Sequence, residues 1–244
     1  MSTLEKLKGA QDRKELALLI GFTPSALTSI VYKTAIENKY TIFEIPKKNG
    51  ETRTIKAPFP KLKKLQSHLS HLLYACLNEI EEERKATPVS YGFRKQGTVS
   101  ANAKNHKRRR YVLNLDLENF FPTFNFGRVR GFFLKDQSFQ LNNEVATTIA
   151  QIACDGEALP QGSPCSPIIS ELIGQVLDLR LLRFAKKNGV RYSRYADDIT
   201  FSTNQKDFPE SLAVQDSDDL SVWSLGQPLV DKIENAGFTI NPSK

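Results

Sequence analysis

The stretch RYSRYADDITFST, residues 191–203, most constrains how this chain can fold. Strand-forming residues alternate on both sides of two adjacent acids, Asp197 and Asp198. Neighbouring carboxylates repel each other and acids are depleted inside strands, so we expect this pair at the tip of a β-hairpin. An ordinary Asp-rich turn would show the same local pattern. Other parts of the chain must therefore distinguish a turn from a site.

A second predicted strand also ends in an acid. In YVLNLDL the leucines and Tyr111 point to one side, and Asp116 points to the other. Carboxylates on two such strands could converge on one divalent site, because Mg²⁺ prefers hard oxygen ligands. Bound cations would relieve the repulsion between Asp197 and Asp198. Two ions about 3.5–4 Å apart would activate an attacking hydroxyl and stabilise a leaving oxygen.

The third element is LPQGSPCSP, residues 159–167, which precedes a helix-forming segment that ends at Gly189. Ser166 is the predicted N-cap and Pro167 the first helical residue. A loop with glycine lets the backbone approach a base or sugar closely, although a plain turn before a core helix would look the same. Apolar residues at helical spacing predict the buried face: Ile168, Ile169, Leu172, Ile173, Val176 and Leu179.

The N-terminal third of the chain predicts helices followed by a hairpin. Residues 3–36 indicate two or more helices, with Gly21 ending one and Thr23-Pro24 starting the next. A packed helical hairpin is favoured over a DNA-binding one, because Lys33 is the one basic residue of the second helix. Residues 40–58 predict a β-hairpin around an Asn-Gly turn, and residues 60–80 predict an amphipathic helix.

The charge is distributed unevenly along the chain. Residues 203–235 hold seven acids and two lysines, a net charge of −5, so the rest of this +7 chain carries +12. A basic body indicates a polyanionic partner, most simply nucleic acid, with solubility alone as the alternative. The densest basic run, Lys104–Arg110, leads directly into the strand of Asp116. We therefore expect this run at the rim of a site.

The cysteines and the apolar runs argue against several other classes of protein. Three cysteines at wide spacings predict buried reduced thiols, neither a disulfide framework nor a zinc site. The longest apolar runs are short and broken by charges, and residues 1–10 lack the apolar core of a secretory signal. We expect no membrane segment and a cytoplasmic location.

In chain order, Asp116 with NFF, LPQGSPCSP, YADD and GFTINPSK resemble successive sequence blocks of reverse transcriptases. The stretch Asn102–His106 is similar to the NAxxH element of bacterial retron reverse transcriptases. The resemblance runs from about Tyr40 to Lys244 and is nearest to the retron subgroup with an added Toprim-type nuclease domain, which this sequence does not include. It implies an α+β fold, the fingers and palm of a right-hand polymerase. An antiparallel palm sheet would carry the YADD hairpin and pack on helices.

The resemblance also implies a division of the chain. The chain ends inside the last palm block, so the thumb, with its VTG element, is expected to be absent, and processive synthesis by these residues alone to be weak or absent. The implied parts are an N-terminal helical region (1–38), fingers (39–110) and palm (111–244), the palm including a fingers–palm segment at about 125–158 and an acidic insertion at about 203–226.

Roles for individual residues follow from the same resemblance. Asp116, Asp197 and Asp198 would be catalytic ligands of two Mg²⁺ ions, with Asp198 farther from the metals. Four further positions match residues that bind or select the incoming nucleotide in this family. Gln161 would contact the nucleotide and template, and Phe121 would be a steric gate that excludes a 2′-hydroxyl and so favours dNTPs.

Basic residues complete the implied nucleotide site. Arg53 would grip the triphosphate, because arginine binds phosphate through charge-assisted contacts. Lys47 and Lys48 would assist it. Lys244 matches a lysine proposed to protonate the pyrophosphate leaving group.

The implied substrate is a structured noncoding RNA that serves as template and primer. Priming from a guanosine 2′-hydroxyl would give a branched RNA–DNA product with an RNA–DNA hybrid, in antiphage defence with an effector protein or domain. Simple phosphate attraction without specificity is the alternative for the basic residues. The candidates for holding the RNA are Asn102, His106, Lys107, Arg108, Arg109 and Arg110.

Two other hypotheses remain open. One is another bacterial reverse transcriptase, of the group II intron or abortive-infection type, against which the NAxxH element argues. The other is a truncated RNA-binding protein that does not polymerise, against which the intact acids Asp116, Asp197 and Asp198 argue.

Overall fold

The structure is a computed structural model that describes residues 1–46, 50, 52–85, 87–94 and 97–242. The chain divides into two compact units, and each unit is built from two separate segments. The first unit contains Met1–Ala86 and Phe121–Leu172, and the second contains Thr87–Phe120 and Ile173–Lys244. The fingers and palm boundaries implied by the sequence divide the chain differently and stay predictions.

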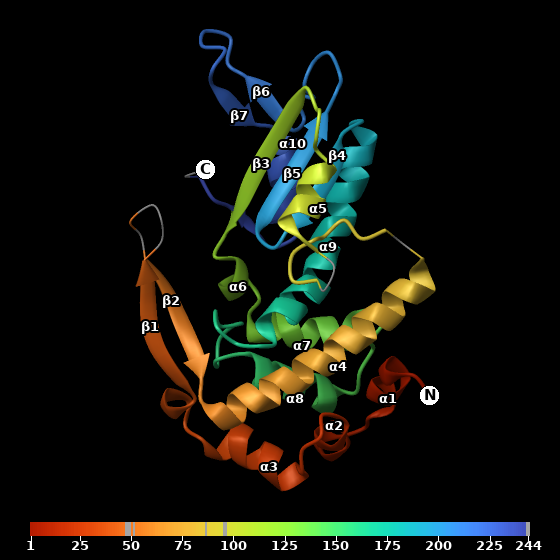
Figure 1. Ribbon diagram of the computed structural model, residues 1–244, viewed down its shortest axis with the longest axis vertical. Coiled ribbons are helices and arrows are strands. Elements are labelled where there is room, and N and C mark those ends of the chain that lie inside the picture. Colours follow the sequence, from red (N-terminus) through yellow and green to blue (C-terminus); the bar gives the residue numbers. More distant parts are fainter. Residues whose placement is uncertain (47–49, 51, 86, 95–96, 243–244) are drawn as a thin grey trace. The chain divides into compact units, whose positions relative to one another are not determined.

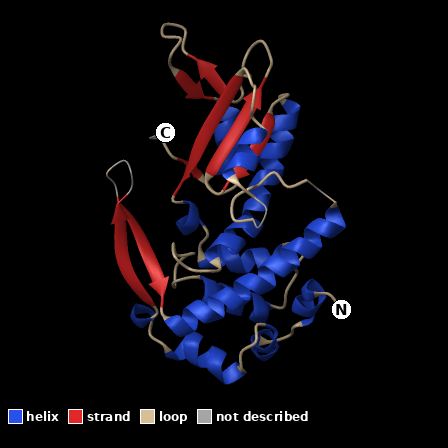
Figure 2. Ribbon diagram, viewed as in Figure 1, coloured by secondary structure: helices blue, strands red, loops and turns tan. Residues whose placement is uncertain are grey.

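Helices and antiparallel strands make up both units, as the α+β prediction requires (Figure 2). Two helices, α6 (Phe120–Thr123) and α9 (Ser166–Lys187), begin in one unit and end in the other. The first unit also holds α1 (Thr3–Gly9), α2 (Arg13–Leu19), α3 (Pro24–Thr28), η1 (Ser29–Lys33), η2 (Ile36–Asn38), β1 (Tyr40–Pro46), β2 (Thr52–Pro58), α4 (Pro60–Arg84), α7 (Phe126–Lys135) and α8 (Asn143–Ala153). The second also holds α5 (Val99–Lys104), β3 (Tyr111–Glu118), β4 (Arg191–Tyr195), β5 (Asp198–Thr203), β6 (Ala213–Gln215), β7 (Trp223–Leu225), α10 (Gln227–Glu234) and β8 (Thr239–Ile240).

Helix α4 forms the centre of the first unit, where it contacts α1 and α8 (Figure 1). It starts with Pro60, whose fixed φ and missing N–H suit the first helical position. The apolar face predicted for residues 60–80, which included Leu72 and not Leu77, is confirmed except at these two positions: Leu72 is half-buried, and Leu77 is buried in the core. Apolar residues recur every three or four positions, so one stripe of the helix can be buried. The buried apolar residues are Leu62, Leu65, Leu69, Leu73, Cys76, Leu77 and Ile80.

The N-terminal helices end and begin where the sequence predicts. Gly21 has a φ of +73°, which glycine adopts at low cost after a helix. Thr23 caps the next helix, because its side chain accepts a hydrogen bond of 3.2 Å from the Ala26 amide. Strands β1 and β2 then form the predicted hairpin, with Tyr40 opposite Pro58. The asparagine of its predicted Asn-Gly turn lies outside the described residues.

The second unit is built on a four-stranded antiparallel sheet in the order β4-β5-β3-β8. Residues 199–203 of β5 are all buried, so both faces of this central strand are covered. Helix α5 contacts β4, and α10 contacts β8. The predicted acidic insertion contains a short hairpin, because β6 and β7 pair from Ala213–Leu225 to Gln215–Trp223.

Two details of α9 differ from the prediction. Ser166 is the first helical residue, and its hydroxyl donates to the Pro160 carbonyl at 2.8 Å instead of capping the helix. Val176 and Leu179 are 41% and 54% exposed, whereas Leu177 and Leu181 are fully buried. Apolar residues occur all around this helix, so spacing alone cannot select its buried face.

The remaining expectations concern cysteines and membrane segments. Cys76, Cys154 and Cys165 are buried thiols, as predicted. Within the described part of the chain, no single helix has the length and apolar character to cross a membrane. One pair of helices, Arg13–Leu19 and Pro24–Lys33, reaches that length and composition together but is bent by 108°.

Candidate active site

The adjacent acids lie at a hairpin tip, as the sequence predicts. Tyr195 pairs with Asp198 in the last register position of β4 and β5, and Ala196 and Asp197 form the turn. Ala196 has a φ of +56°, a region that favours glycine, so this turn is conformationally demanding. Asp197 is half-buried and Asp198 is exposed. The turn therefore presents its two carboxylates at one end of the sheet.

The register of the sheet brings Asp116 to the same end. Asp116 on β3 lies directly opposite Asp198 on β5. The amide of Leu117 donates to the Asp197 carbonyl at 3.0 Å, which ties β3 to the hairpin tip. Asp116 is 8% exposed, whereas its β3 neighbour Glu118 is exposed. Asp116 and the adjacent pair Asp197 and Asp198, which come from two separate parts of the chain, are thus neighbours in the second unit.

Sequence reasoning missed one residue of this cluster, Asn241. Its backbone amide donates to the Asp116 carbonyl at 2.8 Å. Its side-chain Nδ2 donates to Asp116 Oδ2 at 2.8 Å. Asn241 follows β8, which pairs with β3 through Leu117 and Ile240. The only sequence signal was its place in GFTINPSK, because the pairing of two strands so far apart cannot be derived from local pattern.

The chemistry of these side chains suits Mg²⁺, which prefers oxygen ligands. The register pair of Asp116 and Asp198 would hold it, with Asp197 beside them at the tip. Among the residues that the structure describes, however, no three His, Cys, Asp or Glu side chains are gathered around one ion position. The donor types fit the ion, whereas a complete three-carboxylate ligand set is not formed.

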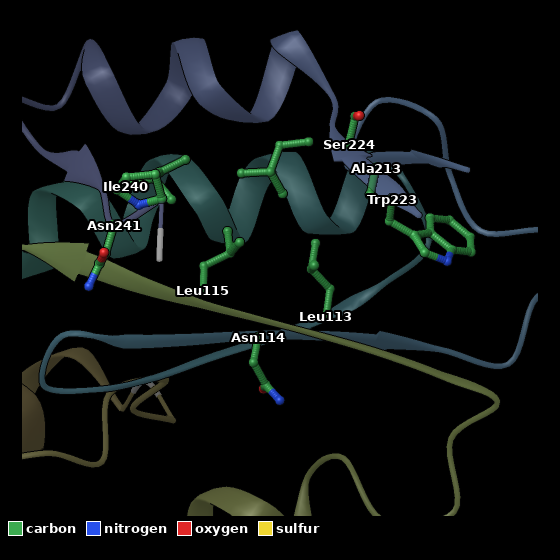
Figure 3. Close-up of a pocket in the computed structure, with 10 residues that line it drawn as sticks. Leu113, Asn114, Leu115, Ala213, Trp223, Ser224, Ile240 and Asn241 are labelled. Carbon is green, nitrogen blue, oxygen red and sulfur yellow. The ribbon is translucent and has the colours of Figure 1, made fainter. Parts of the chain in front are cut away.

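A cavity of about 280 Å³ lies beside Asn241 in the second unit (Figure 3). Leu113 and Leu115 of β3 point into it, while the side chain of Asn114 points to the opposite face of the strand. Ile240 and Trp223 add further apolar wall. Among the residues that the structure describes, no acid lines this cavity, which distinguishes it from the carboxylate cluster.

Three of the residues expected to bind the nucleotide, Arg53, Phe121 and Gln161, belong to the first unit. The Lys56 amide on β2 donates to the Gln161 carbonyl at 2.8 Å, which holds the LPQGSPCSP loop against the β1–β2 hairpin. Gly162 has a φ of +115°, and a Cβ at this position would lie 2.9 Å from the Lys56 carbonyl oxygen. The buried Oε1 of Gln161 has no hydrogen-bond partner among the described residues. The loop is therefore tightly seated against β2.

The other residues expected to contact the nucleotide differ in their exposure. Arg53 is exposed on β2, opposite Ile45. Phe121 is half-buried in α6. Lys244, Lys47 and Lys48 lie outside the described residues.

Asn102 and His106, expected to contact RNA, are both buried at 9% exposure. The Ser193 hydroxyl donates its proton to Asn102 Oδ1. Ser193 Oγ can therefore accept a hydrogen bond from His106 Nε2, which lies 2.7 Å away. His106 Nδ1 then accepts from the Ser202 hydroxyl at 2.7 Å. These bonds join the segment after α5 to β4 and β5. The structure thus gives the NAxxH element an internal contact, and its contact with RNA stays a prediction.

Burial also determines the charge of His106. Burial of the imidazole, together with the smaller effect of the nearby guanidinium groups of Arg191 and Arg109, lowers its pKa to about 4. A pKa of about 4 leaves the ring neutral at neutral pH, as its two roles of donor and acceptor require.

The basic run that follows presents its charges at the surface. Lys107, Arg108 and Arg110 are exposed, and Arg109 is half-buried. The Arg110 guanidinium lies over the Tyr111 ring, 5.5 Å from its centroid. Exposed cations of this kind can contact a phosphate backbone.

Residues 45–244 match the family model described as reverse transcriptase (RNA-dependent DNA polymerase). Curated relatives include the retron Ec86 reverse transcriptase of Escherichia coli, which is 36% identical over 166 residues and aligns with 67% of this chain and 49% of its own length. The retron Mx162 reverse transcriptase of Myxococcus xanthus is 30% identical over 246 residues, with 94% of this chain and 49% of that protein covered. The chain spans about half the length of these curated relatives.

The fold has a counterpart among solved structures. An apo telomerase from Candida tropicalis, truncated from its C-terminal domain, superposes with a TM-score of 0.50 at 16% identity. The match covers 91% of this chain and 55% of the telomerase chain. At that identity the likeness concerns the fold alone.

Proposed function

This chain belongs to the reverse transcriptase family, and on that premise we propose that it is an RNA-directed DNA polymerase of the retron type. The observation that carries the proposal is the pairing of Asp116 with Asp198, next to Asp197 at the hairpin tip. The retron type is supported by curated retron reverse transcriptases among the relatives and by the NAxxH element. Residues 45–244, which match the family model, include all three acids.

The proposed reaction is nucleotidyl transfer by the carboxylate cluster. Two bound Mg²⁺ ions would supply the charge that activates the attacking hydroxyl and stabilises the leaving oxygen. Asp116 and Asp198 would hold them from neighbouring strands, and Asp197 would complete the set from the turn. Asn241 fixes the direction of the Asp116 carboxylate by donating to Oδ2.

Nucleotide selection is assigned to residues of the first unit. Phe121 would exclude the 2′-hydroxyl of a ribonucleotide, so the substrates would be dNTPs. Gln161 would contact the nucleotide and the template, with Gly162 giving the loop its close seat on β2. Arg53 would bind the triphosphate and Lys244 would protonate the pyrophosphate.

A structured noncoding RNA is the proposed template and primer. Priming from a guanosine 2′-hydroxyl would give a branched RNA–DNA molecule, and the protein would act in the cytoplasm in antiphage defence with an effector protein or domain. The exposed cations Lys107, Arg108 and Arg110 support an RNA partner, because they can neutralise phosphates. The net charge of +7 agrees with such a partner.

The deciding experiment is Mg²⁺-dependent dNTP incorporation on co-purified RNA. Asp116→Asn and Asp197→Asn should each lower the rate by at least about a hundredfold, the loss of about 2.7 kcal/mol of transition-state stabilisation. Asp207→Asn, an exposed acid in the loop after β5, is the matched control and should retain the rate. Equal incorporation by Asp197→Asn would refute the metal assignment.

The product separates the remaining hypotheses. A branched product that resists cleavage at the priming guanosine supports the retron type. Incorporation from a 3′-hydroxyl alone would favour another bacterial reverse transcriptase. RNA binding without incorporation would favour an RNA-binding protein.

A further inference from the structure

Arg194, two residues before the turn of the catalytic hairpin, is fully buried. Its guanidinium binds the Asp178 carboxylate through two parallel hydrogen bonds, Nε to Oδ1 and Nη2 to Oδ2, each 2.7 Å long. The Tyr192 hydroxyl donates to the same Oδ1 at 2.6 Å. Asp178, on α9, is itself 4% exposed. The pair is therefore a complete, desolvated ion pair inside the second unit.

The third arm of this guanidinium reaches the hairpin tip. Arg194 Nη1 donates to the Ala196 carbonyl at 3.0 Å. That carbonyl belongs to the residue with a φ of +56°, and the next residue is Asp197. A non-glycine residue in this region costs about 1–2 kcal/mol and persists where its surroundings hold it. Arg194 supplies such a hold from within the protein.

The backbone around the pair leaves room for this one arrangement. A Cβ at Gly174, four residues before Asp178 on α9, would lie 2.8 Å from Arg194 Nη2 and 3.1 Å from its Cζ. A Cβ at Gly92 would lie 2.2 Å from the Ala196 amide nitrogen. Gly174 therefore makes space for the guanidinium and Gly92 for the tip.

The backbone of Arg194 also binds the neighbouring segment from Val89 to Tyr91. The Arg194 amide donates to the Val89 carbonyl at 2.9 Å, and the Tyr91 amide donates to the Arg194 carbonyl at 2.8 Å. Main chain and side chain of Arg194 thus hold the segment before Gly92, α9 and the tip together.

A buried ion pair is a weak source of stability, because desolvation offsets most of the attraction and an apolar pair of similar volume often serves as well. A pair of apolar residues could not, however, donate a hydrogen bond to the Ala196 carbonyl. The geometry therefore indicates a task other than stability. We propose that Arg194, oriented by Asp178, is a positioning residue that fixes the turn conformation in which Asp197 and Asp198 are presented. This role of Arg194 goes beyond the proposed function. It rests on that function only where the test measures how dNTP incorporation depends on Mg²⁺.

The most informative variants disturb the contact between Arg194 and the Ala196 carbonyl and leave Asp116, Asp197 and Asp198 in place. Arg194→Lys keeps the charge but loses the planar fork that binds both Asp178 oxygens while a third N–H reaches the Ala196 carbonyl. Gly174→Ala keeps every charged group and only crowds the guanidinium, and alanine is the better helix former, so a defect cannot come from a weaker α9. Leu212→Ala is the control, because Leu212 is fully buried in the same unit but makes none of these contacts.

The first readout is the Mg²⁺ concentration that gives half-maximal incorporation. It should rise by about tenfold in Arg194→Lys and Gly174→Ala, as for the loss of one buried hydrogen bond. Leu212→Ala should lower thermal stability and leave this concentration unchanged. A merely structural pair would behave as Leu212→Ala does.

The second readout is amide hydrogen exchange, which needs no activity. Exchange at residues 195–198 should quicken selectively by about tenfold in both variants and not in Leu212→Ala. If the wild-type chain incorporates no dNTP, the proposed polymerase function fails while this comparison still decides the role of Arg194. If Arg194→Lys does not fold, Gly174→Ala alone decides. Folded variants with wild-type exchange at the tip overturn the inference.

Discussion

Asn241 holds Asp116 by two hydrogen bonds of 2.8 Å, one to its carbonyl and one to Oδ2 of its carboxylate. The acid is therefore oriented from β8, whereas the opposing tip is held from the other side of the sheet by Arg194. Polar side chains outside the acidic cluster thus define how its carboxylates are presented.

Replacing Asn241 by alanine tests that orientation. Asn241→Ala removes the Oδ2 contact and keeps the backbone bond, so the free energy of unfolding should fall by only about 1 kcal/mol. The Mg²⁺ concentration for half-maximal incorporation should rise, because the Asp116 carboxylate can rotate. Urea unfolding and Mg²⁺ titrations measure the two effects. Asn204→Ala, which loses the bond from the Arg110 amide instead, is the control, and the same metal dependence in both variants would contradict the role of Asn241.

Phe121 should control the choice of sugar. Phe121→Val opens space where a 2′-hydroxyl would lie, and the ratio of kcat/KM for rNTP to that for dNTP should rise by at least about tenfold, or 1.4 kcal/mol. The two ratios are obtained from single-nucleotide incorporation. Phe132→Val, at another half-buried phenylalanine of the first unit, should leave the ratio unchanged. An unaltered ratio in Phe121→Val would remove Phe121 from the site.

His106 should make stability depend on pH. Its pKa is about 4 in the folded protein against about 6.5 when unfolded, so the unfolded state binds more protons between these values. Stability should therefore be complete above pH 6.5 and decline by up to about 3 kcal/mol as pH falls towards 4.

Urea unfolding across this pH range measures the effect. His106→Gln should flatten the decline, whereas His71→Gln, at an exposed position of α4, should retain it. Equal slopes for wild type and His106→Gln would show that the imidazole is not held neutral by its two serines.

Gly162 should be intolerant of a side chain. Gly162→Ala places a Cβ 2.9 Å from the Lys56 carbonyl oxygen at a φ of +115°, so unfolding free energy should fall by about 1–2 kcal/mol or more. The KM for dNTP should rise, because the displaced loop carries Gln161. Gly131→Ala in α7, where nothing lies within 4 Å of the new Cβ, should instead be neutral or stabilising. Similar KM values for both variants would argue against a nucleotide role for this loop.

Local pattern was sufficient for the elements that carry the acids. Alternation predicts the hairpin around Asp197 and Asp198 and the strand of Asp116, and helical spacing predicts the buried face of α4, because these periodicities follow from backbone geometry alone. The same reasoning failed on α9, where Val176 and Leu179 are exposed, because apolar residues surround that helix.

Contacts between distant residues depended on the tertiary structure. Asn241 and Asp116 are 125 residues apart, and Arg194 meets Asp178 across a helix and a strand. Asn102 and His106 point inward for the same reason, because only the packing of α5 on β4 decides that their partners are serines. The sequence by itself therefore determined which residues form the strands and turn that carry Asp116, Asp197 and Asp198. The register of the sheet and the packing of its helices decided which polar groups hold them, because such bonds form only between segments that folding brings together.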